Sequence, residues 1–262
     1  MIFDLHNDFP TAHDCGDYQK YYRETHGHVP TAAIWTTEMR GDVTRKVLDI
    51  RDRLYKARDG KMTYVAIEDI GFLASGDGYK NFPFGYFRYC SLTWNYDNGF
   101  AGGASESGGL TAKGRAAIEY IINGGCLLDV AHLNRRSFFD VMNATEGRVI
   151  CSHTGFNNHL RSLDDGMIKE IIARNGIIGL SLVTAFTGAA NGDGFVAVID
   201  RFVQKHGIDT LALGTDYNGS TDIPSDLSSY HSLEAAVRSL SGYGYTDFDI
   251  NKILCGNAQR ML

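Results

Sequence analysis

Residues that can bind metal ions stand at the ends of several apolar runs in this chain. The first run ends in His6 and Asp8, which are two residues apart. Residues i and i+2 of a strand point to the same face, so this pair offers one imidazole and one carboxylate to a single ion. Later runs end in Glu68, His132, His153 and Asp216. The three histidines, Asp8 and Glu68 form a mixed nitrogen and oxygen set that suits zinc, with manganese or iron as alternatives.

Each of these residues has an ordinary structural explanation when it is taken alone. A single histidine at the end of a strand is usually structural, and Glu68 could be a surface carboxylate. Asp216 is followed by Tyr217-Asn218-Gly219 and could belong to a turn. Six such residues at one end of a barrel are harder to explain, because burying them there without partners would cost their hydration. A metal centre removes that cost.

The runs that carry these residues alternate with stretches of helical periodicity, which predicts a (β/α)₈ barrel. Active sites of such barrels lie at the carboxyl ends of the strands. With 262 residues and 44% hydrophobic content, the chain is large enough for one barrel domain over residues 1–262. The expected strands are residues 2–8, 32–37, 63–68, 89–94, 125–132, 148–153, 177–183 and 210–216. The expected helices are residues 43–58, 112–122, 136–144, 165–173, 195–205, 232–240 and 247–262.

Composition excludes several classes of partner. A net charge of −6 and a pI near 5.8 provide no basic surface for nucleic acid. No apolar run approaches the roughly 18–20 residues of a membrane helix, and no secretion signal is visible, so we expect a cytoplasmic protein without membrane contact. The cysteines are odd in number, widely spaced and without a CxxC pair, and are therefore expected to be reduced thiols. They are Cys15, Cys90, Cys126, Cys151 and Cys255.

Taken in order along the chain, seven segments resemble motifs of the membrane dipeptidases, the peptidase M19 family of the amidohydrolase superfamily. Any one of these segments would be a weak signal, whereas the ordered series is specific. The segments are Asp4-Leu5-His6-Asn7-Asp8-Phe9-Pro10, Ile67-Glu68, Thr111-Ala112-Lys113-Gly114, Leu128-Asp129-Val130-Ala131-His132, Val149-Ile150-Cys151-Ser152-His153, Leu213-Gly214-Thr215-Asp216-Tyr217-Asn218-Gly219 and Cys255-Gly256-Asn257-Ala258-Gln259-Arg260.

The resemblance implies a binuclear zinc site and a dipeptide substrate. His6 and Asp8 would bind one ion, His132 and His153 the other, and Glu68 both. A water bridging the two ions would become hydroxide and attack the amide carbonyl. Asp216 would take the proton and return it to the leaving amine. Dimers are common in this family, so the resemblance also implies a possible homodimer.

Two further residues bear on the substrate. Arg161 resembles an arginine that clamps the terminal carboxylate of the substrate, for which a planar guanidinium is suited, although an ordinary surface arginine is the alternative. Trp94 stands where the family usually has a histidine that stabilises the oxyanion. Losing such a donor typically costs ~10²–10³ in rate, so either another group replaces it or the reaction differs. The alternatives are therefore hydrolysis of another small amide, lactone or ester, or a catalytically silent metal-binding paralogue.

Overall fold

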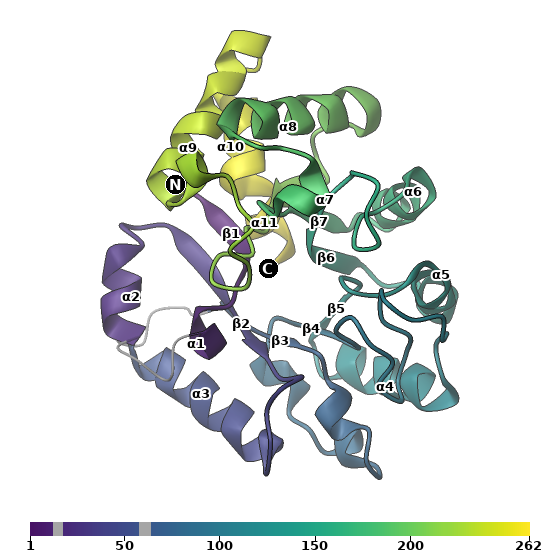
Figure 1. Ribbon diagram of the computed structural model, residues 1–262. Helices are drawn as coiled ribbons and strands as arrows, with labels where there is room; N and C mark the ends of the chain where they lie inside the picture. Colours follow the sequence, from purple (N-terminus) through teal and green to yellow (C-terminus); the bar gives the residue numbers. More distant parts are fainter. Residues whose placement is uncertain (13–17, 58–63) are drawn as a thin grey trace. The chain divides into compact units, whose positions relative to one another are not determined.

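Eight parallel strands form a closed barrel in the computed structural model of the protein, which describes residues 1–12, 18–57 and 64–262. They follow one another around the barrel in chain order (Figure 1). The strands are β1 (Phe3–Asn7), β2 (Val29–Trp35), β3 (Tyr64–Glu68), β4 (Tyr89–Ser91), β5 (Leu127–Asp129), β6 (Val149–Thr154), β7 (Ile177–Leu180) and β8 (Leu211–Leu213). The predicted (β/α)₈ fold is confirmed.

One compact unit of the chain comprises Met1–Asn7, Arg23–Thr31 and Cys151–Leu262. In this first unit β8 pairs with both β1 and β7. Its helices are α6 (Asp165–Ala173), α7 (Thr184–Thr187), α8 (Gly192–His206), α9 (Tyr230–Arg238), α10 (Asp247–Asn251) and α11 (Asn257–Met261), with shorter turns η4 (Ser225–Leu227), η5 (Ser239–Tyr243) and the π-helical η6 (Lys252–Gly256). The predicted helix over residues 247–262 is therefore two α-helices joined by a wider π-helical turn.

The second compact unit comprises Asp8–Tyr22 and Ala32–Ile150. In it β4 pairs with both β3 and β5, and residues of β5 and β6 pair next to them. Its helices are α1 (Phe9–Ala12), most of α2 (Tyr18–Glu24), α3 (Val43–Ala57), α4 (Ala112–Asn123) and α5 (Arg135–Ala144), with 3₁₀ turns η1 (Gly71–Leu73), η2 (Gly78–Lys80) and η3 (Phe84–Tyr86). The expectation of a single domain over residues 1–262 stays a prediction.

Polar side chains fix where several helices begin. Thr111 accepts a hydrogen bond from the backbone N–H of Gly114 at the start of α4. Asn134 and Asp164 do the same for α5 and α6. Such caps satisfy backbone donors that have no partner within the helix, and each is worth about 1 kcal/mol. Because each cap fixes where its helix begins, it also fixes where the preceding loop ends.

Several predicted strands extend too far at their carboxyl ends. The fifth was expected to run to His132 and the eighth to Asp216, but β5 ends at Asp129 and β8 at Leu213. His132 and Asp216 lie three residues further on, in left-handed backbone conformations with φ of 66° and 63°. Left-handed residues cannot continue a strand, so both side chains are presented from the loops that follow the strands.

The cysteines in the described part of the chain carry free thiols. Cys90, Cys126 and Cys151 are buried, and Cys255 is partly exposed. Cys15 lies outside the described residues. In those same ranges, every helix is too short or too polar to span a bilayer.

Candidate metal centre

The first unit brings three of the predicted site residues together. The rings of His6 and His153 have centroids 3.8 Å apart. A ligand atom of His6 lies within 4.8 Å of one on His153, and also within 4.8 Å of one on Asp216. All three side chains are buried, with at most 9% of their surface exposed. Residues 6, 153 and 216 are thus neighbours, although they are far apart in the sequence.

A fully buried carboxylate, Asp4, organises the backbone around His6 and Asp216. It accepts hydrogen bonds from the backbone N–H of Thr215 at 2.8 Å and from the Thr215 hydroxyl at 2.7 Å. It also accepts from the backbone N–H of His6 at 3.1 Å and from the hydroxyl of Tyr230 at 2.6 Å. Burial raises the pKa of Asp4, and these hydrogen bonds offset part of that effect. The carboxylate therefore ties β1 to the loop that carries Asp216.

Other hydrogen bonds hold Asp216, the predicted general base, and His153, a predicted metal ligand, in place. The backbone N–H of Asp216 donates to the carbonyl of His6 at 3.1 Å. The Asp216 carbonyl in turn accepts from the N–H groups of Gly219 and Ser220 in the next turn. The hydroxyl of Ser152 lies 2.9 Å from Nδ1 of His153, a contact that fixes the orientation of the ring.

The second unit pairs Glu68 with His132. Nε2 of His132 lies 2.6 Å from Oε1 of Glu68, and both side chains are buried. The other ring nitrogen, Nδ1, lies 2.9 Å from Oδ1 of Asn95. A histidine that binds a metal typically donates its second N–H to an oxygen in this manner. Asn95 was not among the predicted site residues, because its role depends on a contact with a residue 37 positions away.

Asp8 is the first residue of the second unit and stands directly before α1. Its side chain is buried, and its carbonyl accepts from the backbone N–H of Thr11 in the first turn. Asp8 follows His6 by two residues, as the predicted metal pair requires. Its role as a ligand stays a prediction.

Trp94 and Arg161, the two predicted substrate contacts, have different surroundings. The Trp94 ring lies 6.1 Å from the His132 ring and 5.3 Å from that of Trp35. The guanidinium of Arg161 lies 5.4 Å from the centre of the Phe186 ring and donates to the carbonyl of His153 at 3.4 Å. Arg161 is buried, so the alternative of an ordinary surface arginine is wrong.

A family model described as membrane dipeptidase (peptidase family M19) matches residues 85–262, more than half of the chain. The chain belongs to the membrane dipeptidase family. The resemblance that the ordered motifs predicted is thereby confirmed. Membership of this dipeptidase family makes the chain a hydrolase.

Two relatives show how far the sequence similarity extends. A Klebsiella pneumoniae protein, described as an uncharacterised protein in the pqqA 5′ region, is 27% identical over 212 residues, which are 73% of this chain and 77% of that protein. A Schizosaccharomyces pombe protein described as an uncharacterised dipeptidase is 29% identical over 165 residues. These residues are 56% of this chain and 39% of the yeast protein, so the chain matches well under half of that relative.

Solved structures of metallopeptidases share the fold. Dipeptidase AC, a metallopeptidase of family M19, superposes with a TM-score of 0.86 at 18% identity over 99% of this chain and 97% of that one. A metallopeptidase from Rhodobacter sphaeroides, bound to a phosphinate mimic of L-Ala-D-Ala, gives a TM-score of 0.82 at 17% identity over 100% and 99% of the two chains.

Proposed function

We propose that the chain is a metal-dependent dipeptidase that binds two divalent cations, zinc in preference to manganese or iron. The proposed ligands are His6, Asp8, Glu68, His132 and His153. The observation that carries the proposal is the placement of the His132 ring between the oxygens of Glu68 and Asn95, both within 2.9 Å. A neutral imidazole can donate to only one of these two oxygens, so the ring requires either a second proton or a cation near Nε2, and we assign the cation.

The chemistry of the donor set fits this proposal. Three imidazoles and two carboxylates are all buried, and histidine with carboxylate is the combination found at hydrolytic zinc sites. Bound divalent cations would lower the pKa of a water molecule and polarise the amide carbonyl of the substrate. Coordination to the cations would then offset the free-energy cost of burying these side chains.

Asp216 is the proposed general base and acid. Its carboxylate would accept the proton of the attacking water and return it to the amine that leaves. The left-handed backbone at Asp216 and the hydrogen bond from its N–H to the carbonyl of His6 fix the position of the Asp216 backbone. This position limits where the carboxylate can lie. Such positioning matters because proton transfer requires the donor and acceptor within hydrogen-bond distance.

Arg161 is the proposed partner of the substrate's terminal carboxylate. Its guanidinium is held against the ring of Phe186 and by the carbonyl of His153, which limits its side-chain freedom. A pre-oriented guanidinium can accept a carboxylate in a bidentate geometry. We retain a second candidate function, hydrolysis of another small amide, lactone or ester, because Trp94 stands where the resemblance implies an oxyanion-stabilising histidine, and its indole N–H is a donor of different size and geometry.

The proposal is tested with the purified protein in two measurements. Elemental analysis should find two equivalents of a divalent metal per chain, and a library of dipeptides, small amides, lactones and esters should show hydrolysis of dipeptides that stops on chelation and returns with zinc. Less than one equivalent of metal, or no hydrolysis of any dipeptide by the metal-loaded protein, would overturn it. Hydrolysis of only a lactone or ester would favour the second candidate.

The role of Asp216 has its own test. We expect Asp216→Asn to keep the metal content of the wild type and to lose at least about 10²-fold in kcat, because the amide cannot accept the proton. Asp247→Asn is the matched control, since Asp247 is an exposed carboxylate in the first turn of α10. A kcat of Asp216→Asn equal to that of the control would remove Asp216 from the mechanism.

A further inference from the structure

A cavity of about 500 Å³ lies in the second unit, beside the Glu68 and His132 pair. It is lined by the loops that follow β2, β3 and β4, over residues 36–44, 69–72 and 94–98. Its volume is within the range of about 300–1,000 Å³ that is typical of small-molecule sites. Trp94 forms part of its wall and also neighbours the His132 ring. The function proposed above uses Trp94 only as a departure from the family and leaves this cavity without a role.

The cavity carries an excess of negative charge. Asp42, Asp69 and Asp97 all line it, and its lining residues include no lysine, arginine or histidine. Among the described residues, none of these three carboxylates forms an ion pair. Backbone N–H groups hold two of them in place: Arg45 donates to Asp42 and Gly103 donates to Asp97. Two cations stand at the rim: the Arg40 guanidinium donates to the carbonyls of Thr37 and Met39, and the Lys46 ammonium donates to the carbonyl of Arg40. The three carboxylates outnumber these two cations.

Aromatic rings form the other part of the wall. Trp94, Tyr96 and Phe72 line the cavity, and the Trp94 and Tyr96 rings meet at 63° with centroids 5.5 Å apart. The faces of such rings attract organic cations, with an interaction of about 0.5–2 kcal/mol. Groups of ligand atoms close enough to hold a metal ion occur elsewhere among the described residues, and they do not include these carboxylates. Carboxylates spaced around aromatic rings suit an ammonium or guanidinium group better than a metal ion.

We propose that this cavity binds the cationic side chain of a dipeptide substrate, of the lysine or arginine type. This substrate class rests on the proposed dipeptidase function. Asp69 directly follows Glu68, and Trp94 contacts the region of His132, so a side chain in the cavity belongs to a substrate whose amide lies beside that pair. The carboxylates attract the charge, and the rings cover the alkyl part of the side chain.

The first test is independent of hydrolysis. It measures binding of n-butylguanidine and of neutral n-pentanol, at constant ionic strength, by calorimetry and by tryptophan fluorescence. The chain has two tryptophans, Trp35 and Trp94, whose rings lie 5.3 Å apart, so the fluorescence reports on this cavity. We expect n-butylguanidine to bind at least about tenfold more tightly than n-pentanol, as two partly exposed ion pairs would give.

Three variants test whether n-butylguanidine binds in the cavity. Asp97→Asn should weaken binding of n-butylguanidine about fivefold, the effect of one partly exposed ion pair. Asp42→Asn should do the same while keeping the helix cap, because asparagine caps as well as aspartate. Glu119→Gln is the matched control, since it removes one charge from an exposed position on α4 outside the cavity. Equal binding of n-butylguanidine and n-pentanol, or equal losses in Asp97→Asn and the control, would overturn the proposal.

The second test measures kcat/KM for Lys-Ala and Ala-Lys against their norleucine counterparts, which have nearly the same shape without the charge. One of the two lysine dipeptides should be preferred about tenfold, and Asp97→Asn should reduce this ratio about fivefold. A ratio near one in the wild type would overturn the substrate class. Binding of n-butylguanidine that depends on Asp97, in a protein that hydrolyses no dipeptide, would instead contradict the dipeptidase function and leave the cation site standing.

Discussion

At the scale of single residues, the hydroxyl of Tyr230 completes the hydrogen bonding of a carboxylate that has no access to water. It donates to Asp4 at 2.6 Å and accepts from the side-chain amide of Asn7 at 2.9 Å. We expect Tyr230→Phe to lower the free energy of unfolding by about 1.5–3 kcal/mol, because a buried charge loses a donor. Tyr243→Phe, which removes a hydroxyl from a side chain that is 53% exposed, should change it by less than about 0.5 kcal/mol. Urea denaturation measures both, and equal losses would contradict this role of Tyr230.

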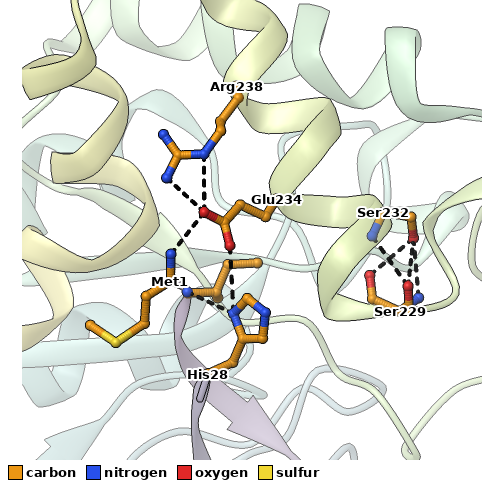
Figure 2. A network of polar contacts seen from close by, with 7 residues as sticks. Met1, His28, Ser229, Ser232, Glu234 and Arg238 are labelled. Atoms are coloured by element: carbon orange, nitrogen blue, oxygen red, sulfur yellow. Dashed lines mark hydrogen bonds and ion pairs between the residues drawn. The ribbon is translucent and has the colours of Figure 1, made fainter. Parts of the chain in front are cut away.

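A second residue, His28, makes stability depend on pH. Burial lowers its pKa, and Glu234 offsets part of this effect, while Met1, His26 and His231 add to the lowering. The backbone N–H of Ile2 donates to Nδ1 at 2.9 Å, so the folded chain requires a neutral ring (Figure 2). The unfolded chain takes up a proton near pH 6.5, where the folded chain does not. The contribution of His28 is therefore present above that pH and is lost as the pH falls below it.

Two variants test whether His28 causes this dependence of stability on pH. His28→Asn keeps an acceptor near Ile2 and removes the titration, so the free energy of unfolding should fall less between pH 7 and pH 5 than in the wild type. His231→Asn, at an exposed position, removes only the smallest of the contributions to the lowered pKa of His28, so its slope should stay close to that of the wild type. Urea denaturation across this pH range would contradict the assignment to His28 if the two variants had the same slope.

Sequence reasoning found the residues of the candidate site that carry metal-binding groups, and missed those that hold them. His6, His153 and Asp216 could be chosen because their types and positions after apolar runs are visible in the chain. Asn95 and Tyr230 have no such signal, since each acts through one contact with a residue that is distant in sequence. Contacts of that kind depend on the folded backbone and not on local pattern.

At the scale of elements, strand positions were predictable and strand ends were not. Apolar runs located all eight strands, but β4, expected over residues 89–94, ends at Ser91. The chain beyond it turns back, with the Ser91 hydroxyl donating to the carbonyl of Thr93. The glycine-rich segment of residues 99–109 is held by close backbone approaches, and a Cβ on Gly102 would lie 2.1 Å from the carbonyl oxygen of Gly108. Glycine indicated the loop but did not reveal these contacts.

A glycine in β7 shows how closely neighbouring strands approach. A Cβ on Gly179 would lie 2.0 Å from the carbonyl oxygen of Ser152, which is backbone and cannot move aside. We expect Gly179→Ala to lower the free energy of unfolding by about 3 kcal/mol or more. Gly242→Ala is the matched control, because nothing lies within 4 Å of the added methyl group and the change should be neutral or slightly stabilising. Thermal denaturation compares the two variants, and a Gly179→Ala protein as stable as the control would contradict the clash.

At the scale of the whole molecule, the fold follows from a pattern that many sequences satisfy. Family structures with 17–18% identity superpose on this chain with TM-scores of 0.82–0.86. Such conservation of architecture is expected, because a barrel requires only alternating apolar strands and amphipathic helices of suitable length. The same generality explains why the substrate could not be derived from the fold and had to be argued from the cavity beside Trp94.

The alkylation rate of the buried thiols can report how often the native protein opens locally. Cys90, Cys126 and Cys151 have at most 3% of their surface exposed, and burial also raises the pKa of the Cys90 thiol. An alkylating reagent can reach them only when the surrounding strands separate, whereas Cys255 is accessible without unfolding. Mass spectrometry should therefore resolve early labelling of Cys255 and slow labelling of Cys90, Cys126 and Cys151, and the slow rate reports how often the barrel opens.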